Sequence, residues 1–227
     1  MDLDFTDEQD MLRKAVRSLC EDAAETVRQL ENDPRGYDDG FWQKLVSMGL
    51  CGLMVPEAYG GSAMGLLDAV VVYEEFGRSL VPSPHLASSV VSAGVLMAGG
   101  SDAQRDTWLA RIASGEAILS PAWLEPDGGF GPAGVRVEAA PDGDGVTLTG
   151  TKRHVAFAAS VDRLVVLARE PAGVSLFLVD PAATGVTLSQ QFSVASDTQY
   201  RVDFDEVRVA DTDRIGDPGT GWDLWHA

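Results

Sequence analysis

The spacing of the apolar residues changes once along this chain, near residue 117, and that change constrains the fold more than any other feature. Before it, apolar residues recur every three or four positions, as at Leu12, Val16 and Leu19, which places them on one face of a helix. After it they alternate with polar residues, as at Val202 and Phe204, which is typical of half-buried strands. The sequence therefore predicts an α+β chain, helical first and β-rich afterwards.

The first part is expected to contain only helices. Two of them begin with a capping box, in which Thr6 pairs with Gln9 and Ser101 pairs with Gln104, because these side chains supply acceptors for free backbone N–H groups. Gly77 is the expected stop of the third helix. The residues of that helix expected to face inward are Leu66, Ala69, Val70 and Tyr73. The expected helices cover residues 6–30, 38–48, 64–76, 84–97 and 101–115.

The second part is expected to form roughly seven to nine strands in an antiparallel barrel or sandwich. Apolar residues alternate at Val135 and Val137, and the denser runs DRLVVLA (162–168) and GVSLFLVD (173–180) fit more buried strands. PDGDG at 141–145 is a hairpin-turn signal, because Gly and Asp tolerate positive φ. Residues 211–221 are expected to be a linker, and residues 222–227 the start of another helix. The expected domains cover residues 1–116, 117–210 and 211–227.

The charge of the chain argues against several classes of partner. Lys and Arg number 17 and Asp and Glu number 35, which gives a net charge of −18 at pH 7. Such a surface repels nucleic-acid phosphates and anionic membranes. There is no secretion signal, no apolar run of the ~18 residues that a membrane span needs, and no disulfide framework, since Cys20 and Cys51 are the only cysteines. We therefore expect a soluble, cytoplasmic protein without nucleic-acid or membrane partners.

Few residues carry a recognisable catalytic pattern. His85, His154 and His226 have no second ligand at metal-binding spacing, so no metal site is expected. The sequence holds no nucleophile elbow, Walker loop or dinucleotide-binding glycine motif. Glu74 and Glu75 are candidates for a paired-carboxylate site, but helical neighbours point about 100° apart, so that one of the two is usually solvated.

Seven segments along nearly the whole chain resemble the flavin-dependent acyl-CoA dehydrogenases in their order and spacing. These segments are VPEAYGG (55–61), YEEFGRS (73–79), GGSDAQRDTWLARIASGE (99–116), LEPDGG (124–129), LTGTKRHV (148–155), VSLFLVD (174–180) and FDEVRVADTDRIGDPGTGW (204–222).

The resemblance implies an enzyme that uses FAD to desaturate an acyl-CoA thioester between its α and β carbons. A carboxylate base takes the α proton, hydrogen bonds to the thioester carbonyl stabilise the developing enolate, and the β hydride passes to flavin N5 in a dry slot. An acyl-CoA substrate, an acceptor of the electron-transfer flavoprotein type and a homo- or hetero-oligomer are implied with it. The base belongs to a C-terminal helical-bundle domain, so no catalytic residue is expected in this chain, which is expected to be a fragment of a longer protein.

The same resemblance places the ligand contacts, and there the chain departs from the family. The family's Thr-Glu-Pro appears as Leu124-Glu125-Pro126, so the threonine hydroxyl is missing. The serine that follows in the family appears as Phe130. The family's Trp-Ile-Thr appears as His154-Val155-Ala156. The expected cofactor-binding residues are Trp123, Leu124, Gly129, Phe130, His154, Val155 and Ala156. The expected substrate-binding residues are Val90, Ala93, Gly94, Met97 and Phe130.

Two of these residues have a second interpretation. His154 either faces the flavin or is a polar residue at a strand end, and Trp123 either covers the flavin or belongs to the core. The neighbouring Lys152 and Arg153 are expected to be charges at the edge of a strand.

Three functions fit the sequence. The first is an acyl-CoA dehydrogenase-like flavoenzyme. The second is a non-catalytic partner subunit of a heteromeric acyl-CoA dehydrogenase, because Leu124, Phe130, His154 and Ala156 are what decayed flavin contacts would look like. The third is an acyl-CoA-binding or structural module without redox activity, since a fold alone does not guarantee a function.

Overall fold

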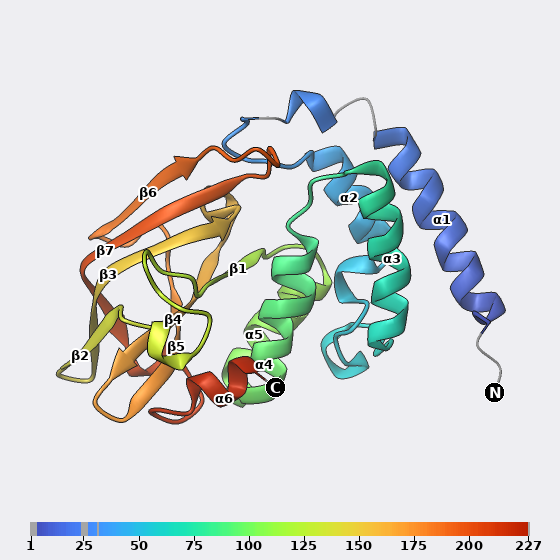
Figure 1. Ribbon diagram of the computed structural model, residues 1–227. Coiled ribbons are helices and arrows are strands. Elements are labelled where there is room, and N and C mark those ends of the chain that lie inside the picture. The colour runs from blue at the N-terminus through green and yellow to red at the C-terminus, as the bar shows by residue number, and fades with distance from the viewer. Residues whose placement is uncertain (1–3, 24–26, 31, 227) are drawn as a thin grey trace.

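The computed structural model describes residues 4–23, 27–30 and 32–226. Helices gather on one side of the molecule and a sheet on the other, and the last helix, α6, returns to lie beside α4 (Figure 1). The α-helices are α1 Asp7–Ala23, α2 Asp39–Ser47, α3 Leu66–Ser79, α4 Ala93–Gly99, α5 Asp102–Ala113 and α6 Gly221–His226. A π-helix, Leu86–Ser92, precedes α4, and short 3₁₀ turns cover Val27–Gln29, Leu50–Gly52, Glu57–Tyr59, Pro132–Gly134, Ala158–Ser160 and Asp211–Asp213.

One mixed, mostly antiparallel sheet of eight strands makes up the β part of the described chain. The strands are β1 Leu119–Ala122, β2 Glu138–Asp142, β3 Gly145–Ala156, β4 Arg163–Glu170, β5 Gly173–Val179, β6 Val186–Gln191, β7 Gln199–Ala210 and β8 Arg214–Ile215. Their order is β6-β7-β3-β2-β4-β5-β8, and β1 and β2 both pair with β4 in parallel. The expected α+β class is confirmed, and the hairpin expected at residues 141–145 joins β2 to β3.

Strand β4 separates two hydrophobic cores. Val165 and Leu167 face α5, where they cluster with Leu109 and Ile112. Val166, between them, enters the other core, which lies among β2, β3, β7 and the first helices. Successive residues of a strand point to opposite faces, and both faces of this strand are covered. The dense apolar run therefore follows from burial on two sides.

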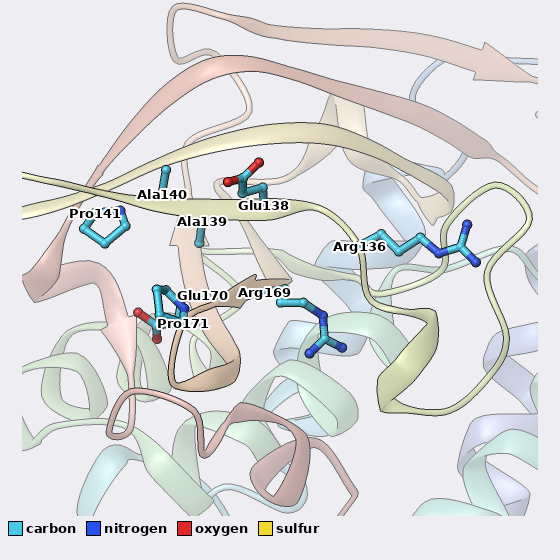
Figure 2. A pocket seen from close by; sticks show the side chains of 8 residues that line it. All are labelled: Arg136, Glu138, Ala139, Ala140, Pro141, Arg169, Glu170 and Pro171. Atoms are coloured by element: carbon cyan, nitrogen blue, oxygen red, sulfur yellow. The ribbon is translucent and has the colours of Figure 1, made fainter.

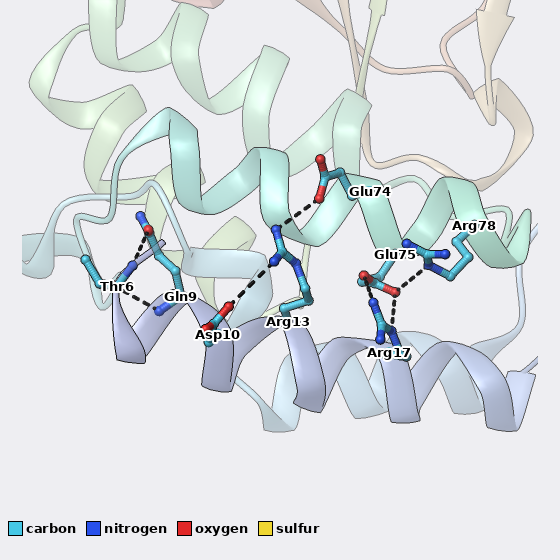
Figure 3. Close-up of polar contacts among 8 residues, drawn as sticks. All are labelled: Thr6, Gln9, Asp10, Arg13, Arg17, Glu74, Glu75 and Arg78. Carbon is cyan, nitrogen blue, oxygen red and sulfur yellow. Dashed lines mark hydrogen bonds and ion pairs between the residues drawn. The ribbon is translucent and has the colours of Figure 1, made fainter. Parts of the chain in front are cut away.

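Polar side chains join α1 to α3 along the seam between them (Figure 3). Glu75 is 1% exposed and accepts hydrogen bonds from Arg17 at 2.9 and 3.0 Å and from Arg78 at 3.1 Å. The hydrogen bonds from Arg17 lower the pKa of Glu75 below its usual range, so this carboxylate is ionised at neutral pH. Glu74 is half exposed and accepts a hydrogen bond from Arg13, whose Nη2 lies 3.2 Å from Glu74 Oε2. The two glutamates therefore bind different arginines and join helices, and they form no paired-carboxylate site.

The boundaries of the first helix differ from the expectation. Within the described residues α1 ends at Ala23, and Val27–Gln29 is a separate 3₁₀ turn. The expectation of one helix through residue 30 was therefore wrong. Residues 24–26, which the expected helix included, lie outside the described residues.

Helix α3 also differs, both in its end and in its buried face. It continues through Gly77 to Ser79 and ends where Leu80 takes the left-handed conformation at φ 52°. Leu66 and Val70, expected to face inward, are 64% and 43% exposed. Ala69 is buried as expected, and the buried face continues through Val72 and Phe76, which keep the helical spacing of three and four.

The segment expected as one helix over residues 84–97 begins with a π-helix. There the Ser92 hydroxyl donates to the Ala87 carbonyl at 2.7 Å, five residues earlier, and a hydroxyl competing for backbone carbonyls favours such departures from regular helix geometry.

Two further expectations about strands were wrong. Val135 and Val137 are buried but precede β2, because the backbone N–H groups at residues 136 and 137 donate to the Glu125 carboxylate rather than to a strand. The expected linker contains β8, whose Ile215 is fully buried against β5.

Glu75→Gln tests the seam between α1 and α3. The lowered pKa of Glu75 means that its carboxylate stabilises the fold above the unfolded value of about 4.3 and that this stabilisation is lost as the pH falls through the folded value. We expect Glu75→Gln to lower the free energy of unfolding by about 1–2 kcal/mol at pH 7, and by less at pH 4. Urea denaturation at both pH values measures this. Glu74→Gln is the matched control, expected to change it by less than about 0.5 kcal/mol; equal losses in the two variants would contradict the assignment.

Candidate functional site

The two segments that the resemblance assigns to the flavin, residues 123–130 after β1 and residues 154–156 at the end of β3, lie close together. The backbone N–H of Arg153 donates to the Leu124 carbonyl at 2.9 Å. The Lys152 ammonium donates to the Trp123 carbonyl at 3.3 Å. These segments, with the ends of β6 and β7 beside them, form the candidate site.

A buried ion pair joins the two segments. Lys152 is fully buried and Glu125 is 5% exposed, and the Lys152 Nζ lies 2.6 Å from Glu125 Oε1. The carboxylate also accepts the backbone N–H of Arg136 at 2.9 Å and that of Val137 at 3.1 Å. One carboxylate therefore holds strand β3 and the segment before β2 against the loop that carries Trp123 and Leu124.

The charge state of this pair follows from its surroundings. Burial lowers the pKa of Lys152 to about 8, while the Glu125 carboxylate opposes that change. The lysine therefore keeps its proton at neutral pH, and the contact is ionic. The expectation that Lys152 is a charge at a strand edge was wrong.

A bulge in β3 brings Val155 to the same buried face as Lys152. Lys152 pairs with Val202 and Val155 pairs with Tyr200, so two residues of β3, Arg153 and His154, lie opposite one residue of β7, Arg201. Residues an odd number apart normally point to opposite faces, but the extra residue of a bulge turns both inward. At the bulge, the backbone of His154 adopts the strained left-handed conformation, with a φ of 53°.

His154 is exposed, and its polar atoms have partners within the chain. Its backbone N–H donates to Gln191 Oε1 at 2.9 Å, and its Nδ1 lies 2.6 Å from Gln199 Oε1. An amide oxygen only accepts, so Nδ1 carries the proton. The next two residues differ, since Val155 is 1% exposed and lies in the core while Ala156 is half-buried. Gln191 and Gln199 are site residues that the sequence did not indicate, because they meet His154 only through strand pairing.

Aromatic rings line the other side of the candidate site. The ring of Trp123, which is half-buried, lies 6.1 Å from that of Phe130 and 5.6 Å from that of Trp225 on α6. Phe130 is 78% exposed, Gly129 is exposed and Leu124 is half-buried. Trp123 therefore belongs to the edge of a core and also borders the open surface.

The expected substrate residues lie on the π-helix and on α4. Ala93 is fully buried in the core that contains β4 and α5, while Val90, Gly94 and Met97 are half-buried. Met97 and Trp123 pack against that same core, so α4 and the aromatic side of the candidate site are neighbours.

His85 is a buried histidine with a structural role. Its Nδ1 lies 2.6 Å from the Tyr73 hydroxyl and its Nε2 lies 2.8 Å from the Leu50 carbonyl. Burial lowers the pKa of His85, which keeps the ring neutral. Within the described part of the chain, no three His, Cys, Asp or Glu side chains gather as metal ligands. Every helix described is too short or too polar to cross a bilayer.

Comparison with known protein families accounts for both parts of the chain. Residues 6–116 match the family model described as acyl-CoA dehydrogenase, N-terminal domain. Residues 120–207 match the model described as acyl-CoA dehydrogenase, middle domain.

Individual relatives agree with the family models. The chain is 31% identical to acyl-CoA dehydrogenase FadE27 of Mycobacterium tuberculosis over 92% of this chain and 54% of that protein. A chain of the ChsE4-ChsE5 complex of Mycobacterium tuberculosis superposes with a TM-score of 0.88 at 29% identity, over 100% of this chain and 60% of that one. The Tcur3481-Tcur3483 steroid ACAD G363A variant gives a TM-score of 0.82 at 32% identity, over 92% and 57%. The chain thus spans little more than half of these relatives.

Lys152→Met tests the ion pair at the centre of the site. Removing the lysine leaves a buried carboxylate without its counter-charge, so we expect the free energy of unfolding to fall by about 3–5 kcal/mol. Adding Glu125→Gln should recover part of this loss, because the amide oxygen still accepts from the two backbone N–H groups. Urea denaturation measures both changes. Arg201→Met, which removes an exposed partner of Asp203, is the control and should lower the free energy of unfolding by less than about 1 kcal/mol. An equally small loss for Lys152→Met would contradict a stabilising role of the buried ion pair.

Proposed function

The chain belongs to the acyl-CoA dehydrogenase family, and on this basis we propose that it is a subunit of an FAD-dependent enzyme that desaturates acyl-CoA thioesters. One structural observation carries the proposal. The two segments that face the flavin in the resemblance are held together by the buried Lys152–Glu125 pair. Because the chain spans 54% of FadE27, the activity is proposed for the whole protein.

The candidate site offers aromatic surface to the flat face of a flavin but lacks side-chain hydroxyls for its edge. Trp123 and Phe130 present aromatic surface against which a flat ring can pack. Leu124 and Ala156 have no hydroxyl, and the imidazole of His154 is already bonded to Gln199. The residues present therefore fit the face of an isoalloxazine, and backbone groups can still bond its edge.

Bound FAD would supply the hydride acceptor, and the residues of this chain would position it. The Lys152–Glu125 pair fixes the backbone at Trp123 and Leu124, which orients the wall of the site. The apolar side chains of Trp123, Leu124 and Phe130 would exclude water from it. The resemblance assigns the base that takes the α proton to a helical domain beyond the residues described.

A second candidate is a partner subunit in a heteromeric acyl-CoA dehydrogenase. The missing hydroxyls at Leu124 and Ala156 favour it, because a partner with intact contacts would then hold the flavin. Two of the similar solved structures are named after two proteins each, the ChsE4-ChsE5 complex and the Tcur3481-Tcur3483 steroid ACAD. The second name supports a steroid-linked acyl group as the substrate class.

The remaining properties of the proposed enzyme follow the family. An acceptor of the electron-transfer flavoprotein type is supported by the similarity to the CarC subunit of the caffeyl-CoA reductase-Etf complex of Acetobacterium woodii, which is 27% identical over 96% of this chain. We propose a cytoplasmic oligomer with an acyl-CoA substrate.

Co-expression separates the two candidates. The complete protein is purified alone and with a family member that keeps threonine at both positions equivalent to Leu124 and Ala156. The partner-subunit function predicts a colourless protein alone and a yellow complex, whose visible flavin absorbance is bleached by an acyl-CoA under anaerobic conditions. A yellow protein alone that is bleached by substrate identifies a self-sufficient enzyme and contradicts the partner role. Absence of flavin and of bleaching in both preparations would contradict the proposed function.

A further inference from the structure

Strand β6 forms one edge of the sheet, and among the described residues no segment pairs with its outer side (Figure 1). On its inner side it pairs with β7, from Val186 opposite Phe204 to Gln191 opposite Gln199. At the other edge of the sheet, β8 has only two residues and α6 lies beside β5. An open edge presents N–H and C=O groups that can pair with another strand, and proteins usually protect such an edge with charge, proline or a short length.

The register between β6 and β7 shows which backbone groups lie on the open side. The N–H of Asp205 donates to the Gly185 carbonyl at 2.9 Å, and the pairing continues without a shift as far as Gln191. Antiparallel pairs alternate between hydrogen-bonded and non-hydrogen-bonded positions. Leu188 and Gln190 therefore direct their backbone N–H and C=O groups away from β7, toward the open edge.

The segment around β6 also lacks the charges that usually protect an edge. Residues 181–196, which we call the β6 strip, contain no Asp, Glu, Lys, Arg or His, and none of them is buried. Phe192 and Val194 are exposed apolar side chains within it. The equally long uncharged run at residues 86–101 is mostly buried or half-buried. The β6 strip is therefore an exposed, uncharged surface suited to contact with another chain.

Other parts of the sheet surface carry charged side chains. Figure 2 shows Arg136, Glu138 and Arg169 beside β2 and β4. On β7, next to the β6 strip, Arg201 and Asp203 form an ion pair at 2.8 Å, so their charges compensate each other. Two copies of a chain with a net charge of −18 repel each other. This repulsion is weakest where the contact surface is uncharged, as it is at the β6 strip.

We propose that the β6 strip is a homodimer interface, in which β6 pairs antiparallel with β6 of a second copy of this chain. Antiparallel pairing of a strand with itself obeys a two-fold axis, as a closed dimer requires. An axis at Ser189 places Leu188 opposite Gln190 of the second copy, so that the backbone groups at the two open edges bond to each other. The same register places Val186 opposite Phe192, which joins two apolar side chains.

The end of β6 is held in place without use of its open edge. The side-chain amide of Gln190 donates to the Asp33 carbonyl at 3.4 Å, and Gln191 Oε1 accepts the backbone N–H of His154 at 2.9 Å. The strand is therefore fixed before a second copy binds, which lowers the entropy cost of pairing. Pairing through β6 needs neither flavin nor acyl-CoA, so it goes beyond the proposed function.

Cysteine cross-linking of the complete protein tests the register. At a non-hydrogen-bonded antiparallel pair the Cα atoms lie about 4.5 Å apart, which a disulfide can span. Ser189→Cys should therefore give a covalent dimer, of twice the mass of one chain on a non-reducing gel, after mild oxidation. Cys20 and Cys51 are buried and should not react. Thr149→Cys, at an exposed position of β3, is the control and should remain a single chain on the gel.

A charge at the proposed axis tests the interface itself. Ser189→Lys places two lysines side by side in the dimer, and like charges across an interface oppose association. Analytical ultracentrifugation over a concentration series should show a dissociation constant at least about tenfold higher than that of the wild type. Thr149→Lys, the same substitution away from the β6 strip, should assemble like the wild type. Circular dichroism confirms that the variants are folded.

The outcomes separate a second copy from other occupants of the edge. A covalent dimer of Ser189→Cys together with weaker assembly of Ser189→Lys supports the proposal. Absence of the cross-link, or unchanged assembly of Ser189→Lys, overturns it. A cross-link that forms only with a co-expressed family member also overturns it and assigns the edge to a hetero-oligomer. Neither measurement depends on flavin or turnover, so failure here is distinct from failure of the dehydrogenase function.

Discussion

The buried contact between Lys152 and Glu125 is the interaction on which the candidate site depends. Two charges taken out of water carry a large desolvation cost, which mutual attraction offsets only when further hydrogen bonds satisfy them. Here the carboxylate accepts two backbone N–H groups and the ammonium reaches the Trp123 carbonyl. Three separate segments thus converge on one pair, and removal of either charge would break the ionic link between the loop and β3.

The site combines a preserved scaffold with altered contacts. The glutamate and the lysine of the family segments remain, and they hold the loop and the strand together. The side chains that point outward from this scaffold have changed, because Leu124 and Ala156 offer no hydroxyl and His154 is bonded within the chain. A subunit that keeps its framework but has lost its ring-edge donors is consistent with a role beside a second, flavin-holding subunit.

Features set by neighbouring residues could be predicted from the sequence, and those set by distant packing could not. The capping box at Ser101 and the turn at residues 141–145 are local, and both are confirmed. The burial of Val155 depends on a bulge against β7, which alternation along β3 alone does not reveal. Gln199 reaches His154 only because β3 pairs with β7.

The central proposal is that this chain keeps a flavin scaffold and lacks hydroxyl donors at Leu124 and Ala156. Equilibrium dialysis of FAD against the complete protein measures this directly, comparing the double variant Leu124→Thr/Ala156→Thr with Leu124→Val/Ala156→Val. Valine matches threonine in shape but has no hydroxyl, so only hydrogen bonding separates the two. We predict about thirtyfold tighter FAD binding for the threonine variant, from two hydrogen bonds of about 1 kcal/mol each. Equal affinity in the two variants would contradict it.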